Sequence, residues 1–532
     1  MANFRKDTQT FGPTGHDKTV YEVPMIATKD GQVVSTQNPF PVTTVSSSGG
    51  SGTAAFGELL TASVVPIVQL DGIYGVTEDN GEQFQLYTAF SGEANTVGNQ
   101  FHVKASSTQY SYGVLRSRRF LRYRPGQGAL ARFTARFTQG IANTEQRAGL
   151  FNQENAFMFG YNGTSFGILH SYGFKTEIVE LKITTKSSAS SNATIVLNGV
   201  SFTVALVNDA TINATAAKIA TNNFTGWQVE QRGDTVIFLA LTTGPKNGAY
   251  TFTHGTAVGA FTIVQTGVVG TDDWIPQSEW NKDKCDGSLN PITNQSNINL
   301  DPTKFQVFQI QYRWLGAGVI NFGLEDPNTG NIIIIHSLHW VNRNTTLSVD
   351  NPSMKIGYVA YNLGGGVVEV WGGSMAMFIE GQIDQINYPK STSNAISSSL
   401  TQNIYHHMLS ITNPITHSGK INTREVIVQD MTVAVQSTDP VIASLYIDQP
   451  LATGTHIYNT QTNRLVAVSK EVGTISSTAT PVIEYNLPVD GGQQFDLTKY
   501  RIVLSPGSSL SIALYSTNSI SNSAVSITWK VD

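Results

Sequence analysis

The sequence predicts a mainly β protein made of β-sandwich or jelly-roll units, with a small inserted α+β module and an extended N-terminal arm. Of its 532 residues, 48 are Gly, 25 are Phe and 19 are Tyr, and only 13% are charged. This composition is typical of strands joined by many turns. Alternating apolar and polar residues recur in strand-length runs such as 305–314, and this alternation predicts half-buried strands.

The charge balance and the single cysteine limit the function classes. The formal net charge is −5, with no basic excess, so we expect no nucleic-acid partner. Cys285 stands alone, which excludes a disulfide within the chain. The first residues lack the apolar core of a signal peptide, and the apolar runs are of strand length. We therefore expect synthesis in the cytoplasm and no membrane insertion.

The N-terminal region is predicted to be an extended arm. Residues 1–43 show little periodicity and contain turn formers at Gly12-Pro13 and Pro39-Phe40-Pro41. The run 46–52 consists of Ser and Gly, which is the composition of a flexible linker. We assign 1–53 to an arm and linker that dock onto a neighbouring protein, and a disordered terminus is the alternative.

A central β-sandwich is predicted from two stretches with similar strand signals. Strand signals dominate 54–175, and similar signals resume after Trp274. The simplest account is one sandwich formed by 54–175 and 271–385, with a separate unit inserted in a surface loop. Loops tolerate insertions because the entropy of loop closure rises slowly with length.

The inserted unit, 176–270, is predicted to combine strands with one helix. A hairpin is expected around Asn198-Gly199, because this pair supplies the positive-φ residues of a two-residue turn. Apolar residues at helical spacing predict a helix over 209–224, with Asp209 as its N-cap. The unit is therefore a small α+β module.

A linker and a second β-sandwich are predicted to follow. Residues 386–400, INYPKSTSNAISSSL, are rich in Ser and poor in apolar residues. Strand signals then fill 401–532, with turns about every ten to fifteen residues. This spacing is typical of a β-sandwich or jelly roll.

The sequence predicts no metal site. His336 and His339 are three apart in a strand, so their side chains point to opposite faces. His406 and His407 diverge for a similar reason and are expected at the surface. Acidic residues around Asp272–Asp286 could offer oxygen ligands to Ca²⁺. The spacing of an EF-hand is absent, however, and loop acids usually cap turns. The existence of a Ca²⁺ site there stays open.

We predict a non-enzymatic protein without catalytic residues or a cofactor. The sequence contains no phosphate-binding loop, no Gly-x-Ser-x-Gly elbow and no His-Glu-x-x-His. Cys285 has no obvious histidine base beside it. Arg232-Gly233-Asp234 has the letters of an adhesion tripeptide, but it is expected to be the turn of a hairpin over 227–241. A glycan-degrading enzyme would need paired carboxylates, and the sequence offers no such cluster.

Arginines and aromatics cluster between 115 and 137. If 116–124 is a strand, Arg116, Arg118, Arg122 and Arg124 share one face with Phe120. Such a stripe could bind an anionic polymer, such as nucleic acid or an acidic glycan, or it could pair with carboxylates of a neighbouring subunit. The modest net charge favours the subunit contact. The candidate contact residues are Arg116, Arg118, Arg122, Arg124, Arg132 and Arg136.

Trp340 and Trp371 are candidates for stacking on sugars. Flat aromatic side chains in loops provide such contacts, but a tryptophan more often packs in a core. Both alternatives remain open for these two residues.

Several segments resemble one protein family. They are RRFLRYRPGQGALARFTARF, NAFMFGYNGTSFGILHSYG, WIPQSEWNKDKCDGS and LDPTKFQVFQIQYRWLGAGVINFGLEDPNTG. This pattern, which spans 110–385, is similar to virion structural proteins of large tailed phages, including cyanophages, and of some large algal viruses. The inserted unit, with VLNGVSFTVAL and GPKNGAYTF, resembles small modules that decorate phage tail and fibre proteins.

The resemblance implies a non-enzymatic part of a virus particle, assembled in the host cytoplasm and present in many copies. The first placement is the tail, baseplate, neck or fibre system, and a capsid or vertex protein is the alternative. A glycan-binding or glycan-degrading receptor-binding protein is a further alternative. The implied partners are other virion proteins, further copies of this chain, with a trimer by analogy, and a host-surface glycan.

Overall fold

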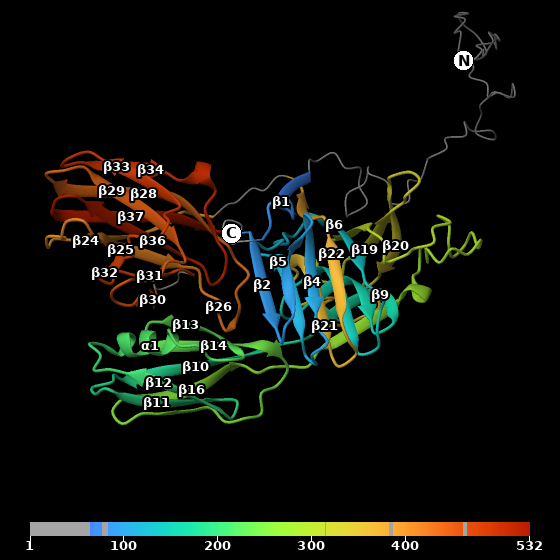
Figure 1. Cartoon of the computed structure of the whole chain (residues 1–532), viewed down its shortest axis with the longest axis horizontal. Coiled ribbons are helices and arrows are strands. Elements are labelled where there is room, and N and C mark those ends of the chain that lie inside the picture. The colour runs from blue at the N-terminus through green and yellow to red at the C-terminus, as the bar shows by residue number, and fades with distance from the viewer. Residues whose placement is uncertain (1–63, 77–82, 314, 382–386, 461–464) are drawn as a thin grey trace, which may run out of the picture. The chain divides into compact units, whose positions relative to one another are not determined.

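The structure is a computed structural model that describes residues 64–76, 83–313, 315–381, 387–460 and 465–532. All of them belong to one compact unit, Thr53–Asp532. The predicted arm and linker of 1–53 lie outside the described residues. Antiparallel sheets dominate the described part (Figure 1), which confirms the predicted mainly β class.

The central sandwich consists of two sheets with strands from both sides of the inserted module. The nine-stranded sheet has the order β20 (Ile332–Leu338), β19 (Ile320–Glu325), β18 (Gln306–Tyr312), β6 (Ala129–Phe137), β22 (Val368–Gly372), β4 (Gln100–Ala105) and β3 (Glu93–Val97), with β23 (Ser374–Glu380) paired to β6 and β1 (Val64–Asp71) paired to β23. The seven-stranded sheet has the order β17 (Thr271–Pro276), β9 (Ser165–Tyr172), β8 (Ala156–Asn162), β7 (Thr144–Phe151), β21 (Lys355–Asn362), β5 (Tyr112–Ser117) and β2 (Phe84–Ala89).

An aromatic core lies between these two sheets. Buried and less buried residues alternate along β6, and its inward set places Phe133 between the small residues Ala131 and Ala135. Phe159 of β8 packs on Phe308 of β18, with 4.5 Å between the ring centroids. Burial of an aromatic side chain of this size contributes about 1.5–3 kcal/mol. This layer therefore holds the two sheets together.

The inserted module joins the sandwich between β9 and β17. Its four-stranded sheet has the order β13 (Trp227–Arg232), β14 (Thr235–Thr243), β10 (Thr176–Thr185) and β16 (Val258–Gln265), and its three-stranded sheet has the order β12 (Val200–Leu206), β11 (Ser191–Leu197) and β15 (Thr251–Thr253). The helix α1 (Ile212–Ala220) packs on β10 and β13. The hairpin predicted at Asn198-Gly199 is confirmed, since Leu197 pairs with Val200 and the two turn residues have φ of 50° and 79°.

The start of the helix differs from the prediction. Thr211 is the N-cap, and its Oγ1 accepts a hydrogen bond from the Ala214 N–H at 3.1 Å. Asp209, the predicted cap, instead accepts the hydroxyl of Thr215 at 2.7 Å. Threonine and aspartate are both favourable cap residues, so the local sequence did not rank the two positions. The assignment of Asp209 as N-cap is wrong for this reason.

The C-terminal sandwich also has two sheets. The five-stranded sheet has the order β24 (Lys390–Ile396), β37 (Ile520–Val531), β28 (Val426–Ser437) and β34 (Gly492–Asp496), with β35 (Val503–Leu504) also paired to β28. The seven-stranded sheet has the order β30 (Asn459–Thr460), β31 (Ala467–Ser469), β25 (Tyr405–Thr412), β36 (Ser509–Ser516), β29 (Val441–Ile447) and β33 (Ile483–Leu487), with β32 (Gly473–Ile475) also paired to β25. A ribbon of β26 (Thr416–His417) and β27 (Lys420–Ile421) completes this domain. Short 3-10 turns lie at Gln277–Glu279 (η2) and Thr498–Tyr500 (η3).

Part of the predicted linker is a strand. Residues 390–396 lie in the 386–400 segment, yet they form β24 and pair with β37 from Lys390–Trp529 to Ile396–Ser523. β24 is an edge strand with one paired neighbour among the described strands. An edge strand can be polar because it buries little apolar surface. Composition alone therefore did not distinguish this strand from a linker.

Candidate functional site

The arginine-rich segment leaves the sheet earlier than predicted. β5 ends at Ser117, and residues 118–128 contain only an isolated bridge between Leu121 and Met354. The Ser117 hydroxyl donates to the Arg119 carbonyl at 2.8 Å, and this contact turns the backbone away from an extended course. The expectation of one strand over 116–124 is therefore wrong. The alternation of arginines and aromatics resembles the pattern of a strand, but it does not indicate the residue at which strand pairing ends.

Four arginines of this segment pair with carboxylates of the C-terminal sandwich, and we call this set the arginine clasp. Arg119 Nη2 lies 3.0 Å from Glu425 Oε2, and Arg122 Nη1 lies 3.0 Å from Asp532 Oδ1. The other two members pair Arg118 with Asp448 and Arg124 with Asp532. The Glu425 side chain is only 3% exposed, and shielding from water strengthens a charge-assisted hydrogen bond. The clasp attaches the C-terminal sandwich to the central one within a single chain.

The remaining arginine candidates contact neutral or aromatic groups. Arg116 donates through Nε to Gln85 Oε1 at 3.2 Å, and Arg132 donates through Nη2 to Gln309 Oε1 at 2.6 Å. The Arg136 guanidinium carbon lies 4.5 Å from the centroid of the Trp371 ring. Contact of these arginines, or of the clasp, with a neighbouring subunit stays a prediction.

The two tryptophan candidates are both engaged within the central sandwich. Trp340 is buried, its Nε1–H donates to the Thr346 carbonyl at 2.6 Å, and its ring packs edge-on against Tyr172. The Trp371 ring lies beside His102, with 4.1 Å between the centroids, as well as beside Arg136. These contacts give the rings structural roles in this fold, and sugar stacking by either ring stays a prediction.

The described residues offer no cluster of metal-ligating side chains. They contain no group of three or more histidine, cysteine, aspartate or glutamate side chains that could hold a metal ion. Asp283 accepts hydrogen bonds from the N–H groups of Cys285 at 2.9 Å and Ser296 at 2.7 Å, as expected for an acid that caps a turn. Burial raises the pKa of the Cys285 thiol, which disfavours the nucleophilic thiolate.

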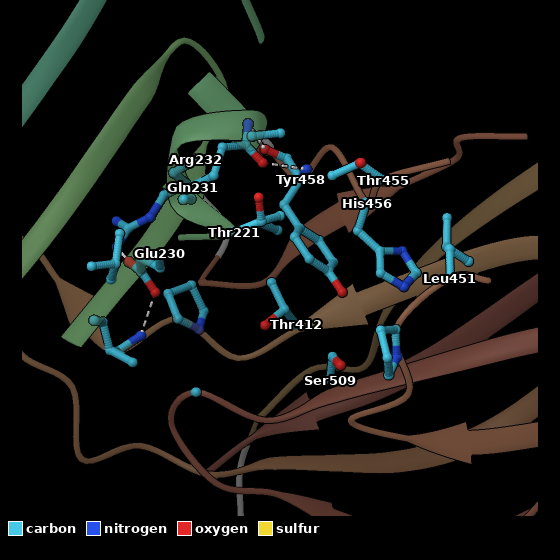
Figure 2. A pocket seen from close by; sticks show the side chains of 18 of the residues that line it. Thr221, Glu230, Gln231, Arg232, Thr412, Leu451, Thr455, His456, Tyr458 and Ser509 are labelled. Carbon is cyan, nitrogen blue, oxygen red and sulfur yellow. Dashed lines mark hydrogen bonds and ion pairs between the residues drawn. The ribbon is translucent and has the colours of Figure 1, made fainter. Parts of the chain in front are cut away.

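A pocket of about 360 Å³ lies between the inserted module and the C-terminal sandwich (Figure 2). We call it the junction pocket. Its module side comes from the end of α1 and from β13, and its other side comes from several loops and strands of the C-terminal sandwich. The principal lining residues are Thr221, Gln228, Glu230, Gln231, Arg232, Thr412, Leu451, Thr455, His456, Tyr458 and Ser509.

The tip of the β13–β14 hairpin closes one end of the pocket. Arg232 pairs with Thr235, so Gly233-Asp234 is a two-residue turn, as predicted. The Gly233 N–H donates to the Tyr458 carbonyl at 2.7 Å, and the Tyr458 N–H donates to Gln231 Oε1 at 2.7 Å. Hydrogen bonds to the Tyr458 backbone thus hold the hairpin tip against the C-terminal sandwich and place the Tyr458 side chain in the pocket (Figure 2).

A compensated ion pair forms the module wall of the pocket. Glu230 and Arg232 pair with each other, and their side chains are 15% and 19% exposed. Glu230 Oε2 accepts the Ile415 N–H at 2.6 Å, while Arg232 Nη2 donates to the Thr416 carbonyl at 2.9 Å. The two charges cancel, so this wall is polar but carries no net charge.

An aromatic pair forms the opposite wall. The His456 and Tyr458 rings are nearly parallel, with 5.5 Å between their centroids. Burial lowers the pKa of His456 and raises the pKa of Tyr458 to about 12. Both rings are therefore neutral at pH 7. His456 Nε2 lies 3.2 Å from the Gln449 carbonyl, which makes it the N–H donor and leaves Nδ1 as the acceptor.

A buried hydrogen-bond chain supports this aromatic wall. His407 Nδ1 lies 2.7 Å from the Glu471 carbonyl, and His407 Nε2 lies 2.7 Å from Ser410 Oγ. The His407 ring packs edge-on against His456 at 4.9 Å. His407 is 1% exposed, so its expected surface position is wrong. In β25 its side chain points inward, whereas the less buried His406 alternates outward.

The pocket offers mainly neutral groups to a ligand. Glu230 is the only carboxylate among the described lining residues, and it is already used by Arg232 and Ile415. Hydrolysis of a glycosidic bond by the usual route needs two carboxylates on either side of that bond. The groups that remain are hydroxyls, an amide, the His456 imidazole and the Tyr458 phenol, and all of them can exchange hydrogen bonds with a ligand.

Sequence reasoning missed every principal residue of the junction pocket as a site residue. Gln228 lies more than two hundred residues before Thr455 and Tyr458, and no motif joins it to them. Three of the six arginine candidates, Arg118, Arg122 and Arg124, lie in the clasp, which positions one wall of the pocket but does not line it.

Comparisons with known proteins identify no family. No protein-family model matches the chain, and no curated protein matches it. The chain is similar to the solved carbohydrate recognition domain of Emp46p, at 12% identity, covering 59% of this chain and 97% of that one, with a TM-score of 0.23. It is also similar to a legume lectin-like domain from Entamoeba histolytica (10% identity, 59% and 98% covered, TM-score 0.23) and to lectin I-B4 from Griffonia simplicifolia (12% identity, 59% and 99% covered, TM-score 0.22). At these scores the likenesses locate no site in this chain.

Within the described part of the chain, no helix has the length and apolar character needed to span a membrane.

We predict that Glu425→Gln weakens the docking of the C-terminal sandwich. The substitution conserves size but removes the charge that Arg119 pairs with, and a hydrogen bond to a charged group contributes about 1.5–3 kcal/mol. Hydrogen exchange of 118–124, followed by mass spectrometry, should accelerate. The matched control is Glu93→Gln, which removes an exposed pair with Lys104 and should change little. Equal exchange in both variants would contradict a role for the clasp in docking.

We predict that the C-terminal sandwich loses stability as the pH falls from about 6.5 to 4. Burial lowers the pKa of His407 to about 4, so the unfolded chain binds this proton at higher pH than the folded chain does. The stabilisation is complete above pH 6.5 and decreases through this window, by up to about 3 kcal/mol. Urea denaturation at both pH values should show a smaller loss in His407→Gln. The same loss in the variant and the parent would rule out His407 as the source.

Proposed function

We propose that this protein is a non-enzymatic, glycan-binding β-sandwich protein, and that the junction pocket holds the sugar. The observation that carries the proposal is the combination of a flat, neutral Tyr458–His456 wall with uncharged polar side chains around it. Sugars present apolar C–H faces and a rim of hydroxyls, so they match a site that pairs an aromatic surface with hydrogen-bonding groups.

Two polar side chains of the pocket are available for ligand hydroxyls. Gln228 and Thr455 line it, and neither side chain has a hydrogen-bond partner among the described residues. An amide and a hydroxyl each donate and accept, as a sugar hydroxyl does. Arg232 Nε and His456 Nδ1 are buried nearby without a protein partner, and such groups cost about 1–3 kcal/mol each when left unpaired. Ordered water or a bound hydroxyl would remove that cost.

The charge balance supports a neutral sugar. Glu230 and Arg232 compensate each other, and the remaining principal lining side chains are uncharged at pH 7. A carboxylated or sulfated sugar would have to compete with Glu230 for Arg232. The volume of about 360 Å³ is at the small end of ligand pockets, which suits one or two sugar rings.

The virus-particle role implied by the sequence resemblance stays a proposal. Glycan binding would define what the protein does on the particle. A β-rich virion protein with an outward sugar pocket would attach the particle to a host-surface glycan. The support for this placement is the resemblance over 110–385 together with the mainly β fold.

We predict that a neutral oligosaccharide binds to the junction pocket and that Tyr458→Ala weakens this binding about tenfold or more. The lost ring contact is worth about 1.5–3 kcal/mol, while the backbone bonds of Tyr458 to the module remain possible. Screening on an array of neutral, sialylated and sulfated glycans should select the ligand, and calorimetry should then measure its Kd.

Two variants serve as controls for this experiment. Tyr458→Phe keeps the ring and should retain most of the affinity. Tyr388→Ala removes a tyrosine that is 86% exposed and outside the pocket, and it should bind like the parent chain. No neutral glycan on the array, or equal affinity in Tyr458→Ala and Tyr388→Ala, would reject the proposed site.

The placement in a particle has its own test. Antibody labelling of purified virions in electron micrographs should mark the tail, baseplate, neck or fibres. Label over the capsid faces would replace this placement by the capsid alternative.

A further inference from the structure

A second, smaller cavity lies where the central sandwich, the inserted module and the C-terminal sandwich meet. It offers about 70 Å³ to the centre of a water molecule, and one water needs roughly 10–15 Å³ on this measure. The space therefore suits a group of several heavy atoms. We call it the basic cavity, because Arg116 and Lys355 both line it.

Two cations of the basic cavity share one neutral acceptor. Lys355 Nζ donates to Gln85 Oε1 at 2.7 Å, and Arg116 Nε donates to the same oxygen at 3.2 Å. Among the described residues, neither cation has a carboxylate within salt-bridge distance. A buried charge without a counter-ion is costly. An anion beside Arg116 and Lys355 would remove this cost.

Lys355 is the more deeply buried of the two cations. It is 4% exposed, and its Nζ lies 4.5 Å from the centroid of the Phe120 ring. Burial and the like charges of Arg116 and Arg118 lower its pKa, and Glu425 opposes them in part. Glu425 is held by Arg119, and Glu154, the one carboxylate that lines the cavity among the described residues, pairs with Lys175. Neither acid pairs with Lys355, so burial favours its neutral amine, and an anion bound beside Nζ would favour the charged ammonium.

Neutral donors complete the surroundings. Gln153 lines the cavity, and its amide has no hydrogen-bond partner among the described residues. The hydroxyl of Thr423 accepts from Asn351 Nδ2 at 3.3 Å, which leaves its own proton available to donate. An anion placed here would meet two cations and two neutral donors.

We propose that the basic cavity binds a small oxyanion, of the size of sulfate, phosphate or a carboxylate group, between Arg116 and Lys355. Arginine and lysine with neutral donors are the groups that recognise such anions. The bound anion would join three domains, since residues of all three line the cavity. The basic cavity shares Gln228 and Ile415 with the junction pocket, but Arg116 and Lys355 do not line that pocket, and the proposal does not rest on glycan binding.

The oxyanion can come from two sources, and calorimetry with the full chain separates them. Sodium sulfate is titrated first, at constant ionic strength set with sodium chloride, and sodium glucuronate is titrated next. A sulfate-only response identifies a free inorganic anion as the ligand. A response to glucuronate as well identifies access for the carboxylate of an acidic sugar. Chloride alone should give no comparable heat.

Three variants test the residues. Lys355→Met and Arg116→Gln should each raise the Kd for sulfate about ten- to a hundredfold, as loss of a charged hydrogen-bond partner does. Arg132→Gln is the matched control, because Arg132 also donates to a glutamine oxygen, Gln309, but lies outside the cavity. It should leave the Kd unchanged.

The result that would overturn the proposal is sulfate binding that survives both substitutions, or heats no larger than those of chloride. Circular dichroism checks the fold of each variant. If Lys355→Met does not fold, Arg116→Gln decides the question, because Arg116 is only half-buried and its loss leaves Lys355 in place. The affinity for a neutral glycan should not change in either variant, which separates this site from the junction pocket.

Discussion

The pairing of Arg119 with Glu425 is the interaction on which the arrangement of the described domains depends most. A carboxylate that is 3% exposed cannot remain unpaired without a large desolvation cost, so the C-terminal sandwich has a strong preference for the one position that offers it a guanidinium. Three further arginines extend the contact to Asp448 and Asp532. The net stability from such pairs is modest, but an incorrectly docked sandwich would leave several charges uncompensated.

The junction pocket is a consequence of this docking. One wall belongs to the inserted module and the other to the C-terminal sandwich, so the pocket exists only when both are held in place. The clasp fixes the sandwich from the side of the central domain, and the hydrogen bonds between Gln231, Gly233 and Tyr458 fix it from the side of the module. Residues that never touch a ligand therefore determine the width of the site.

Local chemistry explains which features were predictable from the sequence. The Asn198-Gly199 hairpin was predictable because the turn needs positive φ at two neighbouring residues, and few residue types provide it. The strand β18 follows from alternation alone. The end of β5 was not predictable, because it depends on a hydroxyl contact at Ser117, and β24 was missed because edge strands tolerate polar residues. Gln228 meets Thr455 and Tyr458 only through the tertiary fold, so no local pattern could join it to them.

The way in which the module enters the central sandwich has a consequence for how such chains diversify. Tyr172 and Thr271, the residues on either side of the insertion, are partners in the same ladder of β9 and β17. The sheet therefore keeps its register whatever is placed between them. Natural variation or engineering could exchange the whole of 176–270 for another small domain without disturbing the aromatic core, and each exchange would supply a new wall opposite Tyr458. Ligand specificity would then evolve by exchange of the inserted domain, while the central sandwich stays constant.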